Sequence, residues 1–148
     1  MERSEPQFGN GQTNSPSLRV CIPPNASYGK GVRDEVIAFA HRNKISICDL
    51  EDFIFALGEA IANAIEHSGS PEVIEIICRI EEDKIVATVT DSGRGFVSDL
   101  LPKTPLPDEF AERGRGLPIM ERCSDIFAVR SVPGKGTAVV LGRYLRVR

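Results

Sequence analysis

Apolar side chains recur every three or four residues along two segments of the chain, which is the spacing of amphipathic helices. The first segment starts at a cap formed by Asn25 or Ser27 and continues to about Arg42. The second begins at Asp49, a favourable N-cap, and ends near His67. Each predicted helix therefore presents one apolar stripe to a core and a polar side to solvent.

Four further segments alternate in polarity and are rich in isoleucine, valine and threonine, which predicts β-strands. They form two hairpins, residues 72–81 with 84–90 and residues 126–132 with 137–144. A short apolar strand over residues 18–22 precedes them and stops at two prolines. The pattern predicts an α/β (α+β) two-layer sandwich, in which helices pack on one face of a mixed, mostly antiparallel sheet.

The chain of 148 residues has the length of one domain. Residues 1–17 are polar, so we expect a flexible N-terminal tail followed by a single folded domain over residues 18–148. Residues 96–113 contain three prolines and form a long irregular segment, which is typical of a mobile lid over a site. Pro118 then fits the first turn of a short helix that continues to about Ser124.

Composition narrows the class of protein. Hydrophobic residues make up 41% of the chain and charged residues 26%, as in globular proteins. The chain has no apolar stretch of the ~20 residues that span a bilayer and no secretory signal, so we expect a cytoplasmic location. A net charge of −3 argues against a general nucleic-acid surface. The four cysteines lie far apart, which favours reduced core thiols over a zinc site.

Candidate chemistry begins on the second predicted helix. Glu59 and Asn63 are four residues apart, so one helix face offers a carboxylate base and a neutral oxygen ligand with Cβ atoms roughly 6 Å apart. Asp91 ends a strand and is followed by Gly93 and Gly95, which suits a sharp turn or the close approach of a flat ring. Taken singly, these residues also fit a solvated helix face and a simple turn. Taken together, they indicate a nucleotide site.

Two commoner phosphate motifs do not match. Gly134-Lys-Gly-Thr137 places a glycine between lysine and threonine and leads into a strand, whereas a P-loop opens a helix. Gly114-Arg-Gly116 is followed by Ile119 where a dinucleotide fingerprint has its third glycine. The sequence therefore supports neither a P-loop nor a dinucleotide-binding fold.

The same residues resemble the signature elements of the GHKL ATPase superfamily, whose members share the Bergerat ATP-binding fold. The resemblance covers residues 18–144, with four elements in the family order: Glu59-x-x-x-Asn63, Asp91-x-Gly93-x-Gly95, Gly114-x-Gly116 and Gly134-Lys-Gly-Thr137. Within the superfamily, the single small domain and the run Ala56-Leu-Gly-Glu-Ala-x-x-Asn-Ala-x-x-His67 are most similar to anti-sigma factor serine kinases of the SpoIIAB and RsbW type.

The resemblance implies a role for each matching residue. Glu59 would be the catalytic residue that polarises the attacking hydroxyl, and Asn63 would hold Mg²⁺ beside ATP. Asp91 would accept a hydrogen bond from the adenine amine, and Thr137 would support the adenine end through its hydroxyl. The remaining nucleotide contacts implied by the resemblance are Gly93, Gly95, Gly114, Arg115 and Gly116.

Several nearby residues keep two interpretations. Arg94 and Arg115 face either solvent or phosphate, and the sequence does not decide between them. His67 fits a phosphate contact, although a histidine at a helix C-terminus also interacts favourably with the helix dipole. Arg33 matches a first-helix arginine that family members use toward the sigma factor, but a solvated helix face is the simpler expectation. Gly58 weakens its helix, which a close neighbour would explain.

By resemblance, the protein is an anti-sigma regulatory factor with ATP-dependent serine protein kinase activity. Its partners would be a sigma factor and a STAS-type anti-sigma antagonist protein, with neither nucleic acid nor membrane, and it would form a homodimer. One alternative is a nucleotide-dependent binding module that sequesters a partner without phosphotransfer. Another is a stand-alone histidine-kinase-type ATPase domain, although the sequence shows no phosphoacceptor histidine helix pair.

Overall fold

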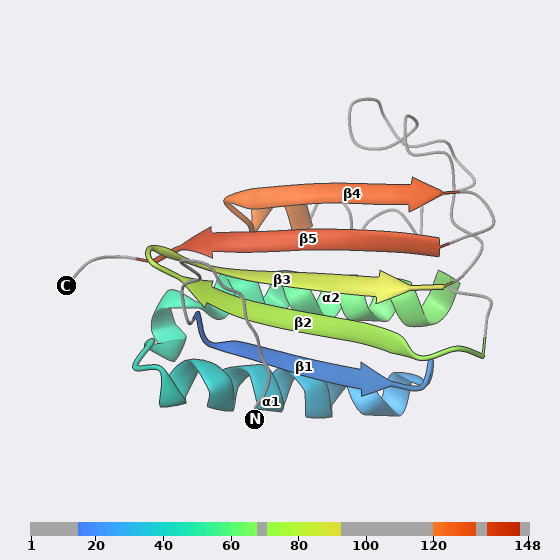
Figure 1. Ribbon diagram of the computed structural model, residues 1–148, viewed down its shortest axis with the longest axis horizontal. Helices are drawn as coiled ribbons and strands as arrows, with labels where there is room; N and C mark the ends of the chain where they lie inside the picture. The colour runs from blue at the N-terminus through green and yellow to red at the C-terminus, as the bar shows by residue number, and fades with distance from the viewer. Residues whose placement is uncertain (1–14, 68–70, 93–119, 133–135, 146–148) are drawn as a thin grey trace, which may run out of the picture.

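The protein folds into a five-stranded sheet with helices on one face (Figure 1). The computed structural model describes residues 15–67, 71–92, 120–132 and 136–145. The strands follow the spatial order β1-β2-β3-β5-β4. Their bounds are Ser17–Ile22 for β1, Ile74–Glu81 for β2, Lys84–Asp91 for β3, Ile126–Val132 for β4 and Gly136–Tyr144 for β5. All four pairings are antiparallel.

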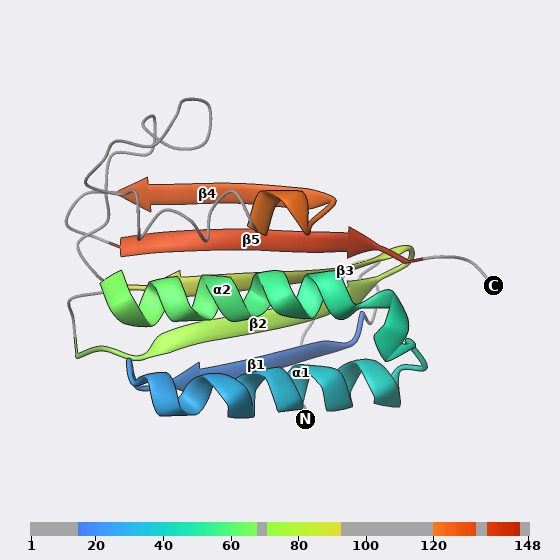
Figure 2. The ribbon, with the colours of Figure 1, turned by 180° about the vertical axis from the view of Figure 1, so that it is seen from behind.

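Two long helices cover the same face of this sheet (Figure 2). Helix α1 spans Gly29–Arg42 and helix α2 spans Glu51–His67. A short 3₁₀ turn, Ala26–Tyr28, leads into α1, and the side chain of Asn25 accepts a hydrogen bond from the Ser27 N–H at 2.9 Å. The predicted cap therefore forms, one turn ahead of the α-helix.

The core lies between the helices and the inward face of the sheet. Ile85, Ala87 and Val89 alternate along β3 and are almost fully buried, as the period of two requires for one face of a strand. From α2, the side chains of Phe53 and Leu57 pack into the same core. Burial of each large apolar side chain contributes about 1.5–3 kcal/mol, so this layer contact holds the two elements together.

The predicted two-layer α/β sandwich is confirmed, as are both hairpins and both long helices. The sheet differs in one respect, because its described strands pair only antiparallel and it is therefore not mixed. Strand β1 begins at Ser17, and the Pro16 carbonyl accepts a hydrogen bond from the Ile80 N–H at 3.0 Å. The rest of the expected tail, residues 1–14, and the expected lid, residues 96–113, lie outside the described residues.

The cysteines correct one expectation. All four are free thiols, but only Cys78 is buried, whereas Cys21 and Cys48 are exposed rather than part of the core. Cys21 points away from the helices because it alternates with the inward-facing Ile22 on β1. No helix in the described part of the chain is both long and apolar enough to cross a membrane.

Candidate functional site

Of the predicted site residues that the structure describes, Asp91, Thr137 and His67 lie at one end of the sheet, whereas Glu59 and Asn63 lie along α2. Strand β3 ends at Asp91, β4 ends at Val132 and β5 begins at Gly136, so three neighbouring strands meet there. Helix α2 ends at His67 over the same end (Figures 1 and 2). The fold thus brings the end of the predicted second helix beside the residue that ends the third strand.

Three polar side chains form a row across these strands. In the strand register Asp91 pairs with Thr137, and Thr137 pairs with Ser131. Residues directly opposite in an antiparallel pair point to the same face, and Asp91 shares the inward face with Val89. Asp91 and Ser131 are both buried, and the Oγ of Ser131 lies 2.9 Å from the Oγ1 of Thr137. A carboxylate and two hydroxyls therefore face the helix layer side by side.

Gly136 lets strand β5 approach the carboxylate-bearing end of β3. Its φ of +120° lies where L side chains are strained. A Cβ atom at this position would lie 2.1 Å from the carbonyl oxygen of Asp91 and 2.9 Å from the Cα of Ser92. Only glycine fits this contact, so the backbone itself is built for close packing behind Asp91.

Glu59 and Asn63 lie one turn apart on α2, both half-buried. Beside them, α2 places Ala56, Ala60 and Ala64 against the core. Small side chains allow a helix to lie close to the sheet, and the two polar residues then stand at the edge of that contact. Their placement off the apolar stripe follows the sequence prediction.

The opposite side of α2 faces α1. Gly58 has Arg33 of α1 as its neighbour, since a Cβ atom on Gly58 would lie 3.4 Å from the Cδ and 3.5 Å from the Nη1 of Arg33. This contact supplies the close neighbour expected for Gly58, and Arg33 is half-buried rather than on a solvated face. Asn63 lies about 140° around the helix from Gly58, so it points away from this contact.

The other predicted residues divide into two groups. His67 is the last residue of α2, its side chain is 19% exposed, and its Nε2 lies 3.6 Å from the Oε1 of Glu66. The second group lies outside the described residues and comprises Gly93, Arg94, Gly95, Gly114, Arg115 and Gly116.

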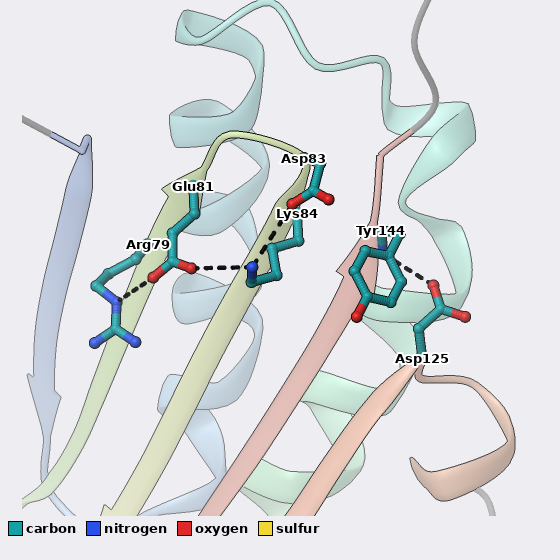
Figure 3. Close-up of polar contacts among 6 residues, drawn as sticks. All are labelled: Arg79, Glu81, Asp83, Lys84, Asp125 and Tyr144. Atoms are coloured by element: carbon teal, nitrogen blue, oxygen red, sulfur yellow. Dashed lines mark hydrogen bonds and ion pairs between the residues drawn. The ribbon is translucent and has the colours of Figure 1, made fainter. Parts of the chain in front are cut away.

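The far end of the sheet carries charges that pair with one another (Figure 3). Lys84 Nζ lies 3.4 Å from Glu81 Oε1 and 3.6 Å from Asp83 Oδ1, and the hydrogen bond with Glu81 raises the pKa of Lys84. Next to the turn between β2 and β3, the backbone N–H of Tyr144 donates to Asp125 Oδ2 at 2.9 Å. Such partly exposed pairs close the ends of strands and add little to stability.

A hollow of about 350 Å³ opens beside this far end, lined by Cys48, Asp49, Asp125, Arg143 and Tyr144. Within the lining, Arg143 Nε lies 4.0 Å from Asp125 Oδ2, and its Nη1 also lies 3.5 Å from Oδ2 of Asp52, which is outside the lining. The lining shares no residue with the predicted nucleotide site. We therefore assign candidate function to the end of the sheet that carries Asp91.

Comparison with known proteins gives the class to which this fold and site belong. The family profile described as a histidine kinase-like ATPase domain matches residues 22–143. The chain is 32% identical to the anti-sigma F factor of Pasteuria penetrans over 114 aligned residues. This alignment covers 72% of this chain and 76% of that protein. It is 30% identical to the serine-protein kinase RsbW of Bacillus velezensis over 138 aligned residues. This alignment covers 86% of this chain and 85% of that relative.

Solved structures support the fold. The RsbU and RsbW domains of Rv1364c from Mycobacterium tuberculosis superpose with a TM-score of 0.68 at 19% identity, over 89% of this chain and 33% of that chain. A histidine kinase domain from Erythrobacter litoralis superposes with a TM-score of 0.53 at 20% identity, over 84% of this chain and 62% of that one.

The chain belongs to the histidine kinase-like ATPase family. This confirms the resemblance to GHKL proteins, and its relatives include proteins named as anti-sigma factors and serine-protein kinases. Membership of an ATPase family implies the use of ATP.

Ser131 was not mentioned in the sequence analysis, and Gly136 was quoted within the element of residues 134–137 without being given a role. Phe127 and Val129 are apolar and face inward on β4, and Ser131 is the polar residue that follows them on the same face. The hairpin that pairs Val132 with Gly136 places Ser131 opposite Thr137. That break in polarity was the available signal for Ser131. For Gly136, the available signal was its place directly before Thr137. Its role lies in its backbone, which packs against the distant Asp91.

Proposed function

We propose that the protein is an anti-sigma regulatory factor that transfers the γ-phosphoryl group of ATP to a serine of an anti-sigma antagonist protein. The observation that carries the proposal is the buried carboxylate of Asp91 at the sheet end over which the helix bearing Glu59 and Asn63 lies. The names of the relatives, an anti-sigma F factor and a serine-protein kinase, support this activity.

In this proposal, residues of the sheet bind the adenine and residues of α2 act at the phosphates. Asp91 accepts a hydrogen bond from the adenine amine, and Thr137 supports that end of the nucleotide. Glu59 takes the proton of the serine hydroxyl. The serine oxygen then bonds to the γ-phosphorus while the bond between this phosphorus and ADP breaks. The backbone of Gly93, Gly95, Gly114 and Gly116, together with Arg115, completes the nucleotide contacts.

Asn63 fits the role of a Mg²⁺ ligand. Its amide oxygen is a hard neutral donor, and Mg²⁺ commonly takes one or two protein oxygens and completes its octahedron with phosphates and water. Among the described residues, no group of three or more histidine, cysteine, aspartate and glutamate side chains could hold a metal ion. A bound Mg²⁺ would neutralise charge on the transferring phosphates, and Asn63 would orient it from α2.

The proposal extends to partners and location. A sigma factor and a STAS-type antagonist are the proposed partners, the folded domain over residues 18–148 is the acting unit, and a homodimer in the cytoplasm is the proposed form. The names of the relatives support the sigma factor and the antagonist as partners, whereas the STAS type, the homodimer and the location rest on the resemblance alone.

ATP binding is tested by thermal unfolding with Mg²⁺ and increasing ATP. At a hundredfold excess over Kd, a ligand that binds only the native state adds about 2.7 kcal/mol, or roughly 5–10 °C in Tm for a domain of this size. Asn63→Ala should remove most of that shift. Asn43→Ala is the control, because the Asn43 side chain donates to the Phe39 carbonyl at 2.8 Å, at the end of α1. No shift at millimolar ATP would overturn the nucleotide site.

Phosphotransfer is tested with Glu59→Gln and radiolabelled ATP. The variant should keep the ATP-dependent Tm shift but lose transfer, because the amide cannot take the serine proton. Glu35→Gln provides the control, since it makes the same change on an exposed position of α1. Transfer at the wild-type rate by Glu59→Gln would remove Glu59 from the role of base.

The nature of the labelled product separates the remaining functions. Acid-stable label on a serine of the antagonist supports the kinase. Nucleotide-dependent complex formation without label would instead indicate a binding module. Acid-labile label on a histidine would indicate the histidine-kinase alternative.

A further inference from the structure

We propose that Phe55 is a docking residue for the protein substrate, which buries this aromatic ring as it brings its serine to Glu59. This inference rests on the proposed function and adds to it the surface that recognises the substrate protein. The occupant is the serine-bearing antagonist protein, and Phe55 acts by contact with that protein rather than in the chemistry of transfer.

Phe55 points away from the core of the molecule. It is 52% exposed, although it lies within helix α2. Phe53, two residues earlier, is fully buried, and a step of two residues turns a helix by about 200°. The ring therefore stands on the outer side of α2, which faces the viewer in Figure 2.

The outer side of α2 is poor in charge around this ring. Between Asp52 and Glu66, the only charged residue of the sequence is Glu59. Ala62, two turns from Phe55 on the same side, is also exposed. A helix side that faces only solvent carries polar and charged residues, whereas the centres of protein interfaces are depleted in charge and enriched in aromatic residues. This side of α2 therefore has the composition of an interface centre.

The ring lies beside the proposed base. Phe55 and Glu59 are four residues apart, so their Cβ atoms are about 5–6 Å apart on the surface of α2. A serine hydroxyl that gives its proton to Glu59 must come within about 2.6–3.2 Å of the carboxylate. A folded protein that brings a serine this close also covers the surface one helical turn away. This requirement selects the phosphate-accepting protein as the occupant, because a second copy of this chain on the ring would block access to Glu59.

The exposed part of the ring is large enough to affect docking. A phenylalanine side chain buries about 150–250 Å² when it is fully covered, so a half-exposed ring leaves roughly 100 Å² for a partner to cover. Loss of this apolar contact should weaken docking about tenfold to fiftyfold.

The test measures phosphotransfer from ATP with Mg²⁺ to a purified STAS-type protein that the wild type phosphorylates. We expect Phe55→Ala to raise KM for this protein about tenfold to fiftyfold. It should leave kcat and the KM for ATP within about twofold, because docking contacts are made equally before and during transfer. Tyr144→Ala is the matched control, since Tyr144 is a 54% exposed aromatic residue at the far end of the sheet. The control should leave all three constants unchanged.

Ala62→Gln gives an independent variant that leaves Phe55 in place. The substitution adds a polar amide to the same side of α2, keeps a good helix former and adds no charge beside Glu59. It should also raise KM for the protein substrate, whereas Ala38→Gln, the same change at an exposed position of α1, should not. Retention of the ATP-dependent rise in Tm shows that each variant is folded.

The outcomes separate this inference from the function on which it rests. A KM for the protein substrate within about twofold of the wild-type value in folded Phe55→Ala overturns the docking role and leaves the kinase standing. A change from dimer to monomer in Phe55→Ala, measured by light scattering, would assign the ring to a second copy and would also overturn the docking role. Absence of transfer by the wild type to any STAS-type protein overturns the proposed function, and the docking role with it.

Discussion

Gly136→Ala tests whether the close approach of β5 to Asp91 builds the site. The glycine has a φ of +120°, and a nonglycine residue in such a region costs about 1–3 kcal/mol. Its new Cβ would stand 2.1 Å from the Asp91 carbonyl oxygen, so two paired backbones would have to separate by roughly 1 Å. Backbone at the start of a strand cannot yield as a flexible side chain does.

The two effects together predict a loss of about 3 kcal/mol of unfolding free energy, or roughly 6–12 °C in Tm. Because the displaced atoms belong to Asp91, the stabilisation by ATP should fall as well. Urea and thermal unfolding followed by circular dichroism measure the first effect, and the same scans with ATP and Mg²⁺ measure the second.

Gly31→Ala is the matched control within α1. A Cβ atom there meets nothing within 4 Å, so the same substitution should stabilise the helix by about 0.5–1 kcal/mol and leave the ATP-dependent shift unchanged. The reasoning is refuted if Gly136→Ala unfolds within 0.5 kcal/mol of the wild type or keeps the full ATP shift.

Two further predictions concern the sheet. Gly142→Ala should lower stability by about 1–3 kcal/mol in urea unfolding, because its Cβ would lie 2.9 Å from the Cδ1 and 3.0 Å from the Cβ of Ile126; an unchanged midpoint would contradict the packing. Burial raises the pKa of Cys78 from 9.0 to about 12, so the native state holds the thiol proton more tightly and stability falls as pH rises above 9. Between pH 8 and 10 this thiol should cost about 1.4 kcal/mol, a loss that Cys78→Ala removes and the exposed-site control Cys21→Ala does not.

The fold was predictable because its signals are local. Apolar spacing sets the helices and alternation sets the strands, so both hairpins closed where the polar turns predicted, as at Glu81 and Lys84. The extra residue at the start of β1 was not predictable in this way, since Ser17 is polar and exposed and is held by its pairing with Arg79 of β2. Pairing with a distant strand leaves no trace in the local pattern.

The site divides in the same manner. Glu59 and Asn63 could be found from their spacing on one helix, and Asp91 from its place at a strand end. Ser131 could not, because its importance depends on the register that sets it beside Thr137. Gly136 is likewise explained by a backbone atom of Asp91, 45 positions earlier in the chain. Contacts between strands carry this information, and a single sequence does not display them.

The separation of the site into two elements has a kinetic consequence under the proposed function. The row of Asp91, Thr137 and Ser131 belongs to the sheet, whereas Glu59 and Asn63 belong to α2. Interactions with the base are made equally in the ground state and the transition state, so changes in the row should raise KM and leave kcat nearly unchanged. Glu59 acts only as the proton moves, so its loss should lower kcat. Changes on the sheet should therefore appear in KM and the loss of Glu59 on α2 in kcat, although both elements act on one nucleotide.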